Sequence, residues 1–96
     1  MKPSIALQTH RAAIRTVVER HNARNARVFG SVLHGEDQEG SDLDILIDPT
    51  PETTLFDIGA IRHELLQLLG VHVDVLTPNA LPDSFRAKVI NEARPV

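Results

Sequence analysis

Two aspartates alternate with apolar residues where an apolar run of the chain begins. Asp42 and Asp44 flank Leu43, and the residues 45–47, Ile-Leu-Ile, follow at once. Side chains two residues apart in a β-strand point to the same face, so the two carboxylates lie side by side and the apolar residues between them face the opposite layer. This pattern predicts a central strand over 43–47 that presents two acids on one face.

The acid pair indicates a metal site. Two carboxylates held this close repel each other unless a cation neutralises them, and oxygen ligands suit a hard divalent ion, so we expect Mg²⁺. A third acid, Asp74, lies within the alternating segment 71–76, Val-His-Val-Asp-Val-Leu, on the face opposite the valines. If the two strands are neighbours, Asp42, Asp44 and Asp74 form a cluster able to hold two metal ions.

A phosphate-binding element is expected just before these acids. Gly30 and Ser31 follow a short β-type run over 27–29 and precede a half-turn of helix from Val32. Backbone N–H groups and the serine hydroxyl at such a turn can bind phosphate oxygens. Ser41 is a second candidate phosphate ligand, although a serine at this place is equally suited to forming the turn.

The other elements follow from helical periodicity and stop signals. We expect a helix from about residue 4 to 21–22, a helix that begins at Thr53 or Thr54 and ends at Gly70, and a last helix over 81–93. The order helix, strand, strand, helix, strand, helix predicts an α/β domain in which helices cover a small mixed sheet of about three to four strands. A chain of 96 residues leaves no room for a second core, so residues 1–96 are expected to form a single domain.

The composition limits the possible cellular location and binding partners of the protein. The net charge of −3 and the scattered basic residues argue against strong direct nucleic-acid binding. The chain has no cysteine, no apolar run near the ~20 residues of a membrane span, and no signal-peptide layout, so we expect a cytoplasmic protein without membrane contact. Three Phe and no Trp or Tyr make a modest core that a partner subunit would help to stabilise, and the oligomeric state stays open.

Several polar residues have structural interpretations. Asp48 shares the face of the acid pair, but an Asp before Pro49 is ordinary turn chemistry. The five histidines show no zinc-type spacing, and only His72, two residues before Asp74, is placed to line the site.

Leu66 and Leu69 widen the apolar stripe of the 53–69 helix. This stripe is interpreted first as core and second as a subunit interface.

The combined motif resembles that of a known superfamily. Gly30-Ser31, Gly35 and Ser41-Asp42-x-Asp44 match the signature of the DNA polymerase β-like nucleotidyltransferases, and most closely that of the minimal nucleotidyltransferases. The helix that follows and the strand end Val-Asp-Val-Leu-Thr-Pro are also similar to that family, so the resemblance covers nearly the whole chain. His34 is a departure, because the family often has Arg there.

The resemblance implies the nucleotidyltransferase fold and a reaction. Asp42 and Asp44 would ligate Mg²⁺, Asp74 would bind the catalytic metal and help deprotonate the attacking hydroxyl, and Gly30 and Ser31 would hold the triphosphate of ATP. Many minimal members pair with a helical HEPN-domain toxin, and some act as antitoxins by transferring AMP to a tyrosine of that toxin.

Two other functions are weighed against this one. The chain could be a catalytically weak or inactive nucleotide-binding module that neutralises or assembles with its HEPN partner. It could also modify a small molecule such as an aminoglycoside, but such enzymes usually carry a second domain for the acceptor. The expected function is therefore that of an Mg²⁺-dependent adenylyltransferase and antitoxin.

Overall fold

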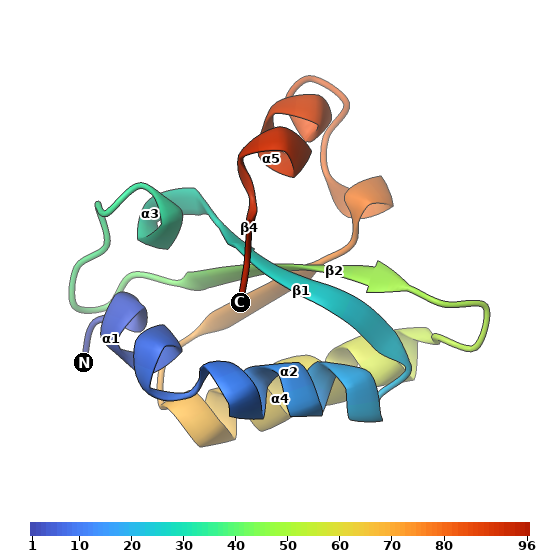
Figure 1. The fold of residues 1–96 in the computed structure, drawn as a ribbon, viewed down its shortest axis with the longest axis horizontal. Coiled ribbons are helices and arrows are strands. Elements are labelled where there is room, and N and C mark those ends of the chain that lie inside the picture. Colours follow the sequence, from blue (N-terminus) through green and yellow to red (C-terminus); the bar gives the residue numbers. More distant parts are fainter.

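A mixed four-stranded sheet organises the chain. The computed structural model describes all 96 residues, and its strands are β1 (Ala23–Phe29), β2 (Leu43–Pro49), β3 (Val73–Leu76) and β4 (Arg94–Pro95). The order across the sheet is β3-β2-β1-β4 (Figure 1). β1 pairs antiparallel with β2 and β4, whereas β2 and β3 are parallel. The prediction of a small mixed sheet covered by helices is confirmed.

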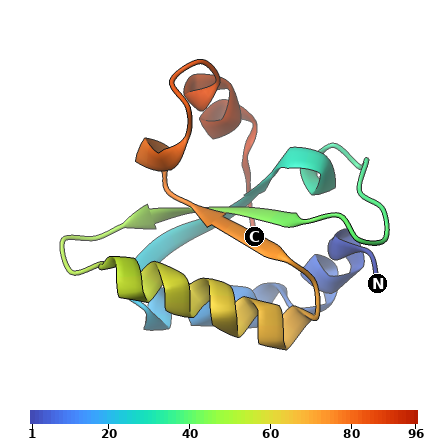
Figure 2. The ribbon, with the colours of Figure 1, turned by 180° about the vertical axis from the view of Figure 1, so that it is seen from behind.

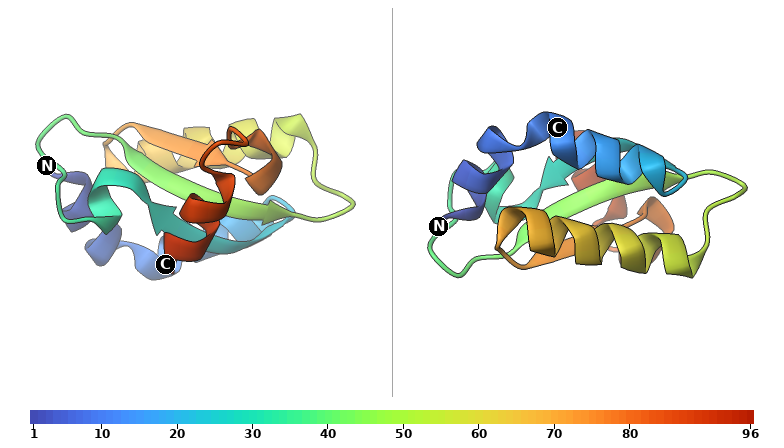
Figure 3. Two further views of the ribbon diagram at one scale, coloured as in Figure 1. Left: turned by 90° about the horizontal axis from the view of Figure 1, so that it is seen from above. Right: turned by 90° about the horizontal axis from the view of Figure 1, so that it is seen from below.

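The two faces of the sheet are covered unequally. α2 (Arg11–Arg20) and α4 (Leu55–Leu69) lie side by side against one face, and α1 (Pro3–Thr9) leads into α2 (Figure 3). The opposite face carries only short elements: α3 (Gly30–Leu33), the 3₁₀ turn η1 (Pro78–Ala80) and α5 (Arg86–Glu92), as Figures 1 and 2 show. Short elements leave room for a site on that second face.

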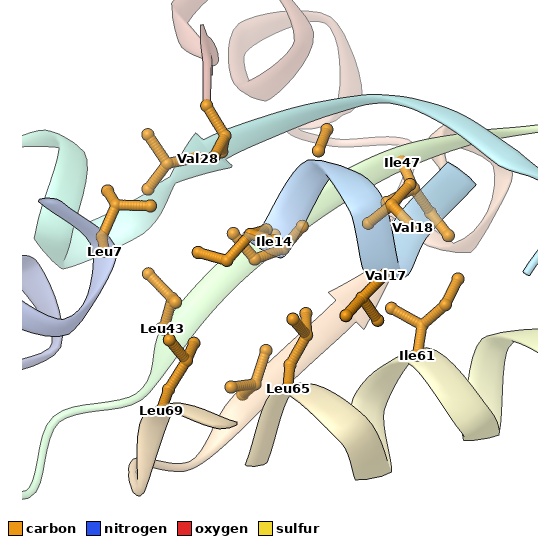
Figure 4. Close-up of a cluster of buried hydrophobic side chains, with 14 of the residues drawn as sticks. Leu7, Ile14, Val17, Val18, Val28, Leu43, Ile47, Ile61, Leu65 and Leu69 are labelled. Atoms are coloured by element: carbon orange, nitrogen blue, oxygen red, sulfur yellow. The ribbon is translucent and has the colours of Figure 1, made fainter. Parts of the chain in front are cut away.

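The core fills the space between the sheet and the long helices (Figure 4). The inward-facing residues of β2 are fully buried, as are their partners on the helices; the set includes Leu43, Ile45, Ile47, Ile14, Ile61 and Leu65. Burying side chains of this size contributes about 1.5–3 kcal/mol each. The inward-facing apolar residues of β2 therefore stabilise the fold, and its acidic residues face away from the core.

Both ends of α4 are where the sequence places them. The Thr54 hydroxyl accepts the N–H of Asp57, and the Asp57 carboxylate accepts the N–H of Thr54, which completes a capping box. At the other end Gly70 adopts the left-handed conformation with φ of 69°. The predicted start and stop are confirmed. Leu69 belongs to the core, while Leu66 is only half-buried.

The prediction of one continuous helix over residues 4 to about 21 is wrong. The chain breaks at His10, whose φ of −126° leaves the helical region and separates α1 from α2. The start of α1 is anchored by a tertiary contact, because the carboxylate of buried Asp37 accepts the N–H of Ser4. The strand that follows is also longer than predicted. It begins at Ala23 and includes an irregularity at Asn25, where φ is 56°.

The C-terminal segment also differs from its prediction. The expected helix over 81–93 begins only at Arg86, and the expected strand over 71–76 begins only at Val73. The Arg86 guanidinium donates to the carbonyl oxygens of Pro78 and Leu81, which holds residues 81–85 in an irregular turn. The two-residue strand β4 was not predicted, because so short a segment carries no periodic signal.

Candidate active site

Asp44 and Asp74 lie in register on adjacent strands. Parallel pairing of β2 with β3 aligns Asp44 with Asp74 and Leu43 with Val73. The carbonyl oxygen of His72 accepts the N–H of Leu43 at 2.8 Å, and Asp42 directly precedes Leu43. The predicted adjacency of the two acidic strands is confirmed. All three acids therefore gather at one end of the sheet, on the face opposite α2 and α4.

The turn at Gly30 closes against this acid pair. Phe29, the last residue of β1, pairs with Asp44, and Gly30 follows with φ of 74°, in the left-handed region. A β-carbon at position 30 would overlap Oδ2 of Asp44 and lie 3.1 Å from its Cγ. Gly30 is thus required both by its backbone conformation and by the space that the carboxylate occupies.

The same turn starts a helix whose first N–H groups are available. Ser31 is half-buried in the first turn of α3, and the N–H groups at a helix start have no partner within the helix. Donors placed beside a carboxylate cluster can bind phosphate oxygens while the acids bind a cation. The arrangement suits a metal-bound polyphosphate.

The acid cluster is electrostatically uncompensated. Burial raises the pKa of Asp44 to about 6, and the carboxylates of Asp74 and Asp42 add to that effect. None of the three acids takes part in an ion pair with Lys, Arg or His. A charge cluster without a cationic partner is unfavourable on its own and favours binding of a cation.

The donor set fits a hard divalent metal. Three carboxylates supply the oxygen ligands that Mg²⁺ prefers. No three acidic or histidine side chains already surround a common point at ligand distance. Asp42 and Asp74 are exposed, so their side chains can turn toward Asp44, which is half-buried and fixed by the turn at Gly30.

Two other candidates are held in structural roles. The Ser41 hydroxyl accepts the N–H of Gln38 at 2.9 Å, which is the turn-forming role weighed above, so its contact with phosphate stays a prediction. Asp48 accepts hydrogen bonds from Arg27 and from Asn25, the latter at 2.9 Å. Asp48 therefore lies outside the acid cluster, as expected, although it is an ion-pair partner rather than a turn former.

A cleft lies beside α3, and no sequence motif indicates it. It has a volume of about 560 Å³ and is lined by Leu33, His34 and residues 91–95 of α5 and β4. Nε2 of His34 lies 3.3 Å from Oε2 of Glu92 across its mouth. The wall contributed by α5 has no motif, and only the fold places it next to the Gly30 turn.

No helix in the structure has both the length and the apolar character needed to cross a membrane.

Comparison with known sequences places this site in a family. Residues 11–96 match the model of the nucleotidyltransferase domain. The chain is 35% identical over 77 residues to a Methanocaldococcus jannaschii protein provisionally named a protein adenylyltransferase, which covers 80% of this chain and 83% of that protein. It is 34% identical over 86 residues to the protein adenylyltransferase MntA of Thermococcus cleftensis, with 90% and 84% covered.

Solved structures agree with the sequence relatives. A structure provisionally described as a minimal nucleotidyltransferase superposes with a TM-score of 0.86 at 39% identity and covers 97% of this chain and 95% of that one. A chain from a toxin–antitoxin complex with AMP-PNP shares the fold, with a TM-score of 0.73 at 16% identity over 88% of this chain and 69% of its own.

The fold is that of the polymerase β-like nucleotidyltransferases. This chain belongs to the nucleotidyltransferase domain family. Within that family of enzymes it is similar to proteins named as protein adenylyltransferases.

Proposed function

We propose that this protein transfers AMP from ATP to a hydroxyl group of a partner protein, a HEPN-domain toxin, and so acts as its antitoxin. The target hydroxyl is a tyrosine side chain, and the reaction depends on Mg²⁺. The observation that carries the proposal is the placement of Asp44 between Asp74 on one side and the Gly30 turn on the other.

The chemistry follows from this placement. The acceptor oxygen forms a bond to the α-phosphorus of ATP, the bond from that phosphorus to the bridging oxygen breaks, and pyrophosphate leaves with the electron pair. We assign receipt of the hydroxyl proton to Asp74, because it is the exposed member of the pair and is open to an acceptor. Gly30 and Ser31 hold the triphosphate through N–H and hydroxyl donors. Divalent metal ions, when bound to Asp42, Asp44 and Asp74, stabilise the charge on the attacking and leaving oxygens.

A protein acceptor suits the architecture. The face that holds the acids carries only the short elements α3, η1 and α5, and Asp42 and Asp74 are exposed, so the acid cluster is open to a partner. A partner protein can supply that missing wall together with the hydroxyl. The relatives named as protein adenylyltransferases, and the fold shared with a chain of a toxin–antitoxin complex, support this choice.

Co-expression tests the proposal. The chain is produced with the helical protein encoded next to it, identified by an Arg and a His about four to six residues apart, and the intact mass of that partner is measured. We expect added AMP groups that disappear in the Asp42→Asn, Asp44→Asn double variant. Asp48→Asn is the matched control, because Asp48 lies on the same strand and face but is bound to Arg27 and Asn25.

Cell growth separates catalysis from binding. If the partner stays unmodified, or if the double variant neutralises the toxin as well as the wild type does, AMP transfer is not the protective activity. The chain would then act as a binding module, the alternative given by the sequence.

A further inference from the structure

The loop between α3 and β2 joins the phosphate half of the candidate site to the metal half. Residues 34–42 leave the end of α3, pass beside α1 and end at Asp42, one residue before β2 begins (Figure 1). Strand pairing fixes Phe29 against Asp44, whereas Asp42 lies outside the strand. The position of Asp42 relative to Ser31, at the start of α3, therefore depends on how this loop is held.

The loop is folded into two turns. In the first turn, the N–H of Glu36 donates to the carbonyl oxygen of Ser31 at 2.9 Å. In the second turn, the N–H of Ser41 donates to the carbonyl oxygen of Gln38 at 3.0 Å, and the N–H of Gln38 donates to the Ser41 hydroxyl. Asp37 is the single residue between the two turns, so its position governs how one turn lies relative to the other.

Asp37 attaches the loop to α1. Its carboxylate accepts the N–H of Ser4 at 2.9 Å. This N–H is in the first turn of α1, where a helix offers it no backbone acceptor, and Lys2 at the N-cap position provides no side-chain acceptor. Asp37 thus supplies, from 33 residues away, the cap that α1 lacks.

Asp37 is the one charged residue that the fold buries. It is 7% exposed, and it forms no ion pair with Lys, Arg or His. The backbone N–H of Ser4 holds the pKa of Asp37 below its usual range, so the carboxylate is ionised at neutral pH. A hydrogen bond to an ionised acceptor is stronger than one between neutral groups, and a buried charge needs such a bond. The contact is therefore specific as well as buried.

α1 gives the loop a fixed point of attachment. Ala6 and Leu7 belong to the main hydrophobic core, and Pro3 is fully buried. The N–H that Asp37 binds lies directly after Pro3. The loop is thus attached to a segment that is packed into the core.

We propose that Asp37 is a positioning residue of the active site. By holding the loop against α1, it fixes the turn that carries Ser41 and Asp42 relative to Ser31. The metal-binding and phosphate-binding groups are then correctly spaced before the nucleotide binds. This inference rests on the proposed function, because it takes Asp42 as a metal ligand and Ser31 as a phosphate ligand.

The energetic reason is preorganisation. The Asp42 carboxylate is exposed and forms no ion pair, so the backbone of the loop limits where this ligand lies. If the loop is free to move, only a fraction of molecules presents the ligands at the correct spacing, and the apparent affinity falls by that fraction. Attachment through Asp37 keeps this fraction high.

Magnesium titrations of the full chain test the role. The Mg²⁺ concentration that gives half of the maximal rise in melting temperature is measured with a non-hydrolysable ATP analogue present. We expect Asp37→Ala to raise this concentration by about three- to tenfold, since loss of a capping bond shifts a local equilibrium by roughly that factor. A concentration equal to that of the wild type would overturn the role.

Thr54→Ala is the control for lost stability. It removes a helix cap of the same kind from α4, which begins beyond the opposite end of β2 from Asp42. It should lower the melting temperature and leave the half-saturating Mg²⁺ concentration unchanged. If Thr54→Ala raises that concentration as much as Asp37→Ala does, the effect is one of general stability and Asp37 has no positioning role.

Asp37→Asn separates the hydrogen bond from the charge. The amide oxygen of asparagine still accepts the N–H of Ser4, while the negative charge is lost. We expect this variant to recover most of the Mg²⁺ affinity that Asp37→Ala loses. Equal losses in both variants would mean that the charge of Asp37 acts on the cation directly, and positioning through the loop would be refuted.

Hydrogen exchange of the metal-free protein distinguishes this inference from the proposed function. Asp37→Ala should speed amide exchange in residues 38–42 by about three- to tenfold, and Thr54→Ala should not. Unchanged exchange in Asp37→Ala would show that Asp37 does not hold the loop. If the wild type shows neither a Mg²⁺ effect nor AMP transfer, the proposed function fails, and the exchange measurement alone then decides whether Asp37 fixes the loop.

Discussion

Gly30 lies against Asp44 so closely that the space for a β-carbon is taken by the carboxylate. The contact joins the end of β1 to the acidic face of β2, two segments separated by the loop and helix between them. It orients the one half-buried acid of the cluster and brings the first N–H groups of α3 to the same point. The element expected to bind phosphate and the element expected to bind metal are therefore one structural unit.

Gly30→Ala should abolish AMP transfer while the protein still folds. The left-handed backbone at this position costs an alanine roughly 1–2 kcal/mol, and its methyl group also displaces the Asp44 carboxylate. Thermal denaturation and transfer to the co-expressed partner are measured together. Gly70→Ala is the control, because Gly70 has nearly the same φ of 69° but open space around it. Equal losses of activity in both variants would contradict a specific role for the contact.

The contribution of Asp44 to the stability of the metal-free protein should fall as pH rises from about 4 to 6. Because the pKa of Asp44 is raised to about 6 in the folded state and is near 3.9 in the unfolded chain, the folded protein binds the extra proton in this range. The stabilisation is full below the unfolded pKa and is lost as the pH passes the folded pKa. Melting temperatures in EDTA, compared between wild type and Asp44→Asn, isolate this effect.

The difference in melting temperature between wild type and Asp44→Asn should depend on pH. Asparagine mimics the protonated acid, so the two proteins should melt alike near pH 4, and the variant should be the more stable one at pH 7. Asp37, Asp57 and Glu64 have lowered pKa values and change stability in the opposite direction, but they are common to both proteins and cancel. A difference that does not vary with pH would show that Asp44 is not the group responsible.

Added Mg²⁺ should raise the melting temperature above pH 6 more than below pH 5. A cation favours ionised carboxylates, and the raised pKa of Asp44 means that the ion competes with a proton at low pH. Asp42→Asn, Asp44→Asn should remove the effect, whereas Asp48→Asn should retain it. A metal-induced shift that persists in the double variant would place the cation elsewhere.

The clustering of the acids could be predicted because its signals are local. The alternation of Asp42 and Asp44 with apolar residues fixes their common face within one strand. β2, α4 and β3 form a strand-helix-strand unit, in which the two strands are parallel and are often neighbours, so Asp74 was also within reach of sequence reasoning.

The parts that could not be predicted depend on tertiary contacts. The start of α1 is anchored by the hydrogen bond from Ser4 to Asp37, 33 residues away. The late start of α5 follows from Arg86 donating to the carbonyl oxygens of Pro78 and Leu81. The cleft beside α3 exists only because α5 and β4 return to that edge of the sheet. None of these contacts leaves a periodic trace in the sequence.

Thr54→Ala should destabilise the protein by about 1 kcal/mol, since a lost N-cap hydroxyl typically costs 0.5–2 kcal/mol. The substitution removes the acceptor for the Asp57 N–H. The backbone N–H of Thr54, the largest cause of the lowered pKa of Asp57, is kept, although the hydroxyl that also lowers this pKa is lost. Asp57 therefore stays ionised, and the loss should be the same from pH 5 to pH 8. Urea denaturation measures it, with Thr16→Ala as the control for a helical surface threonine whose hydroxyl bonds to the carbonyl of Ala12. An unchanged stability in Thr54→Ala would mean that the capping box contributes nothing to the fold.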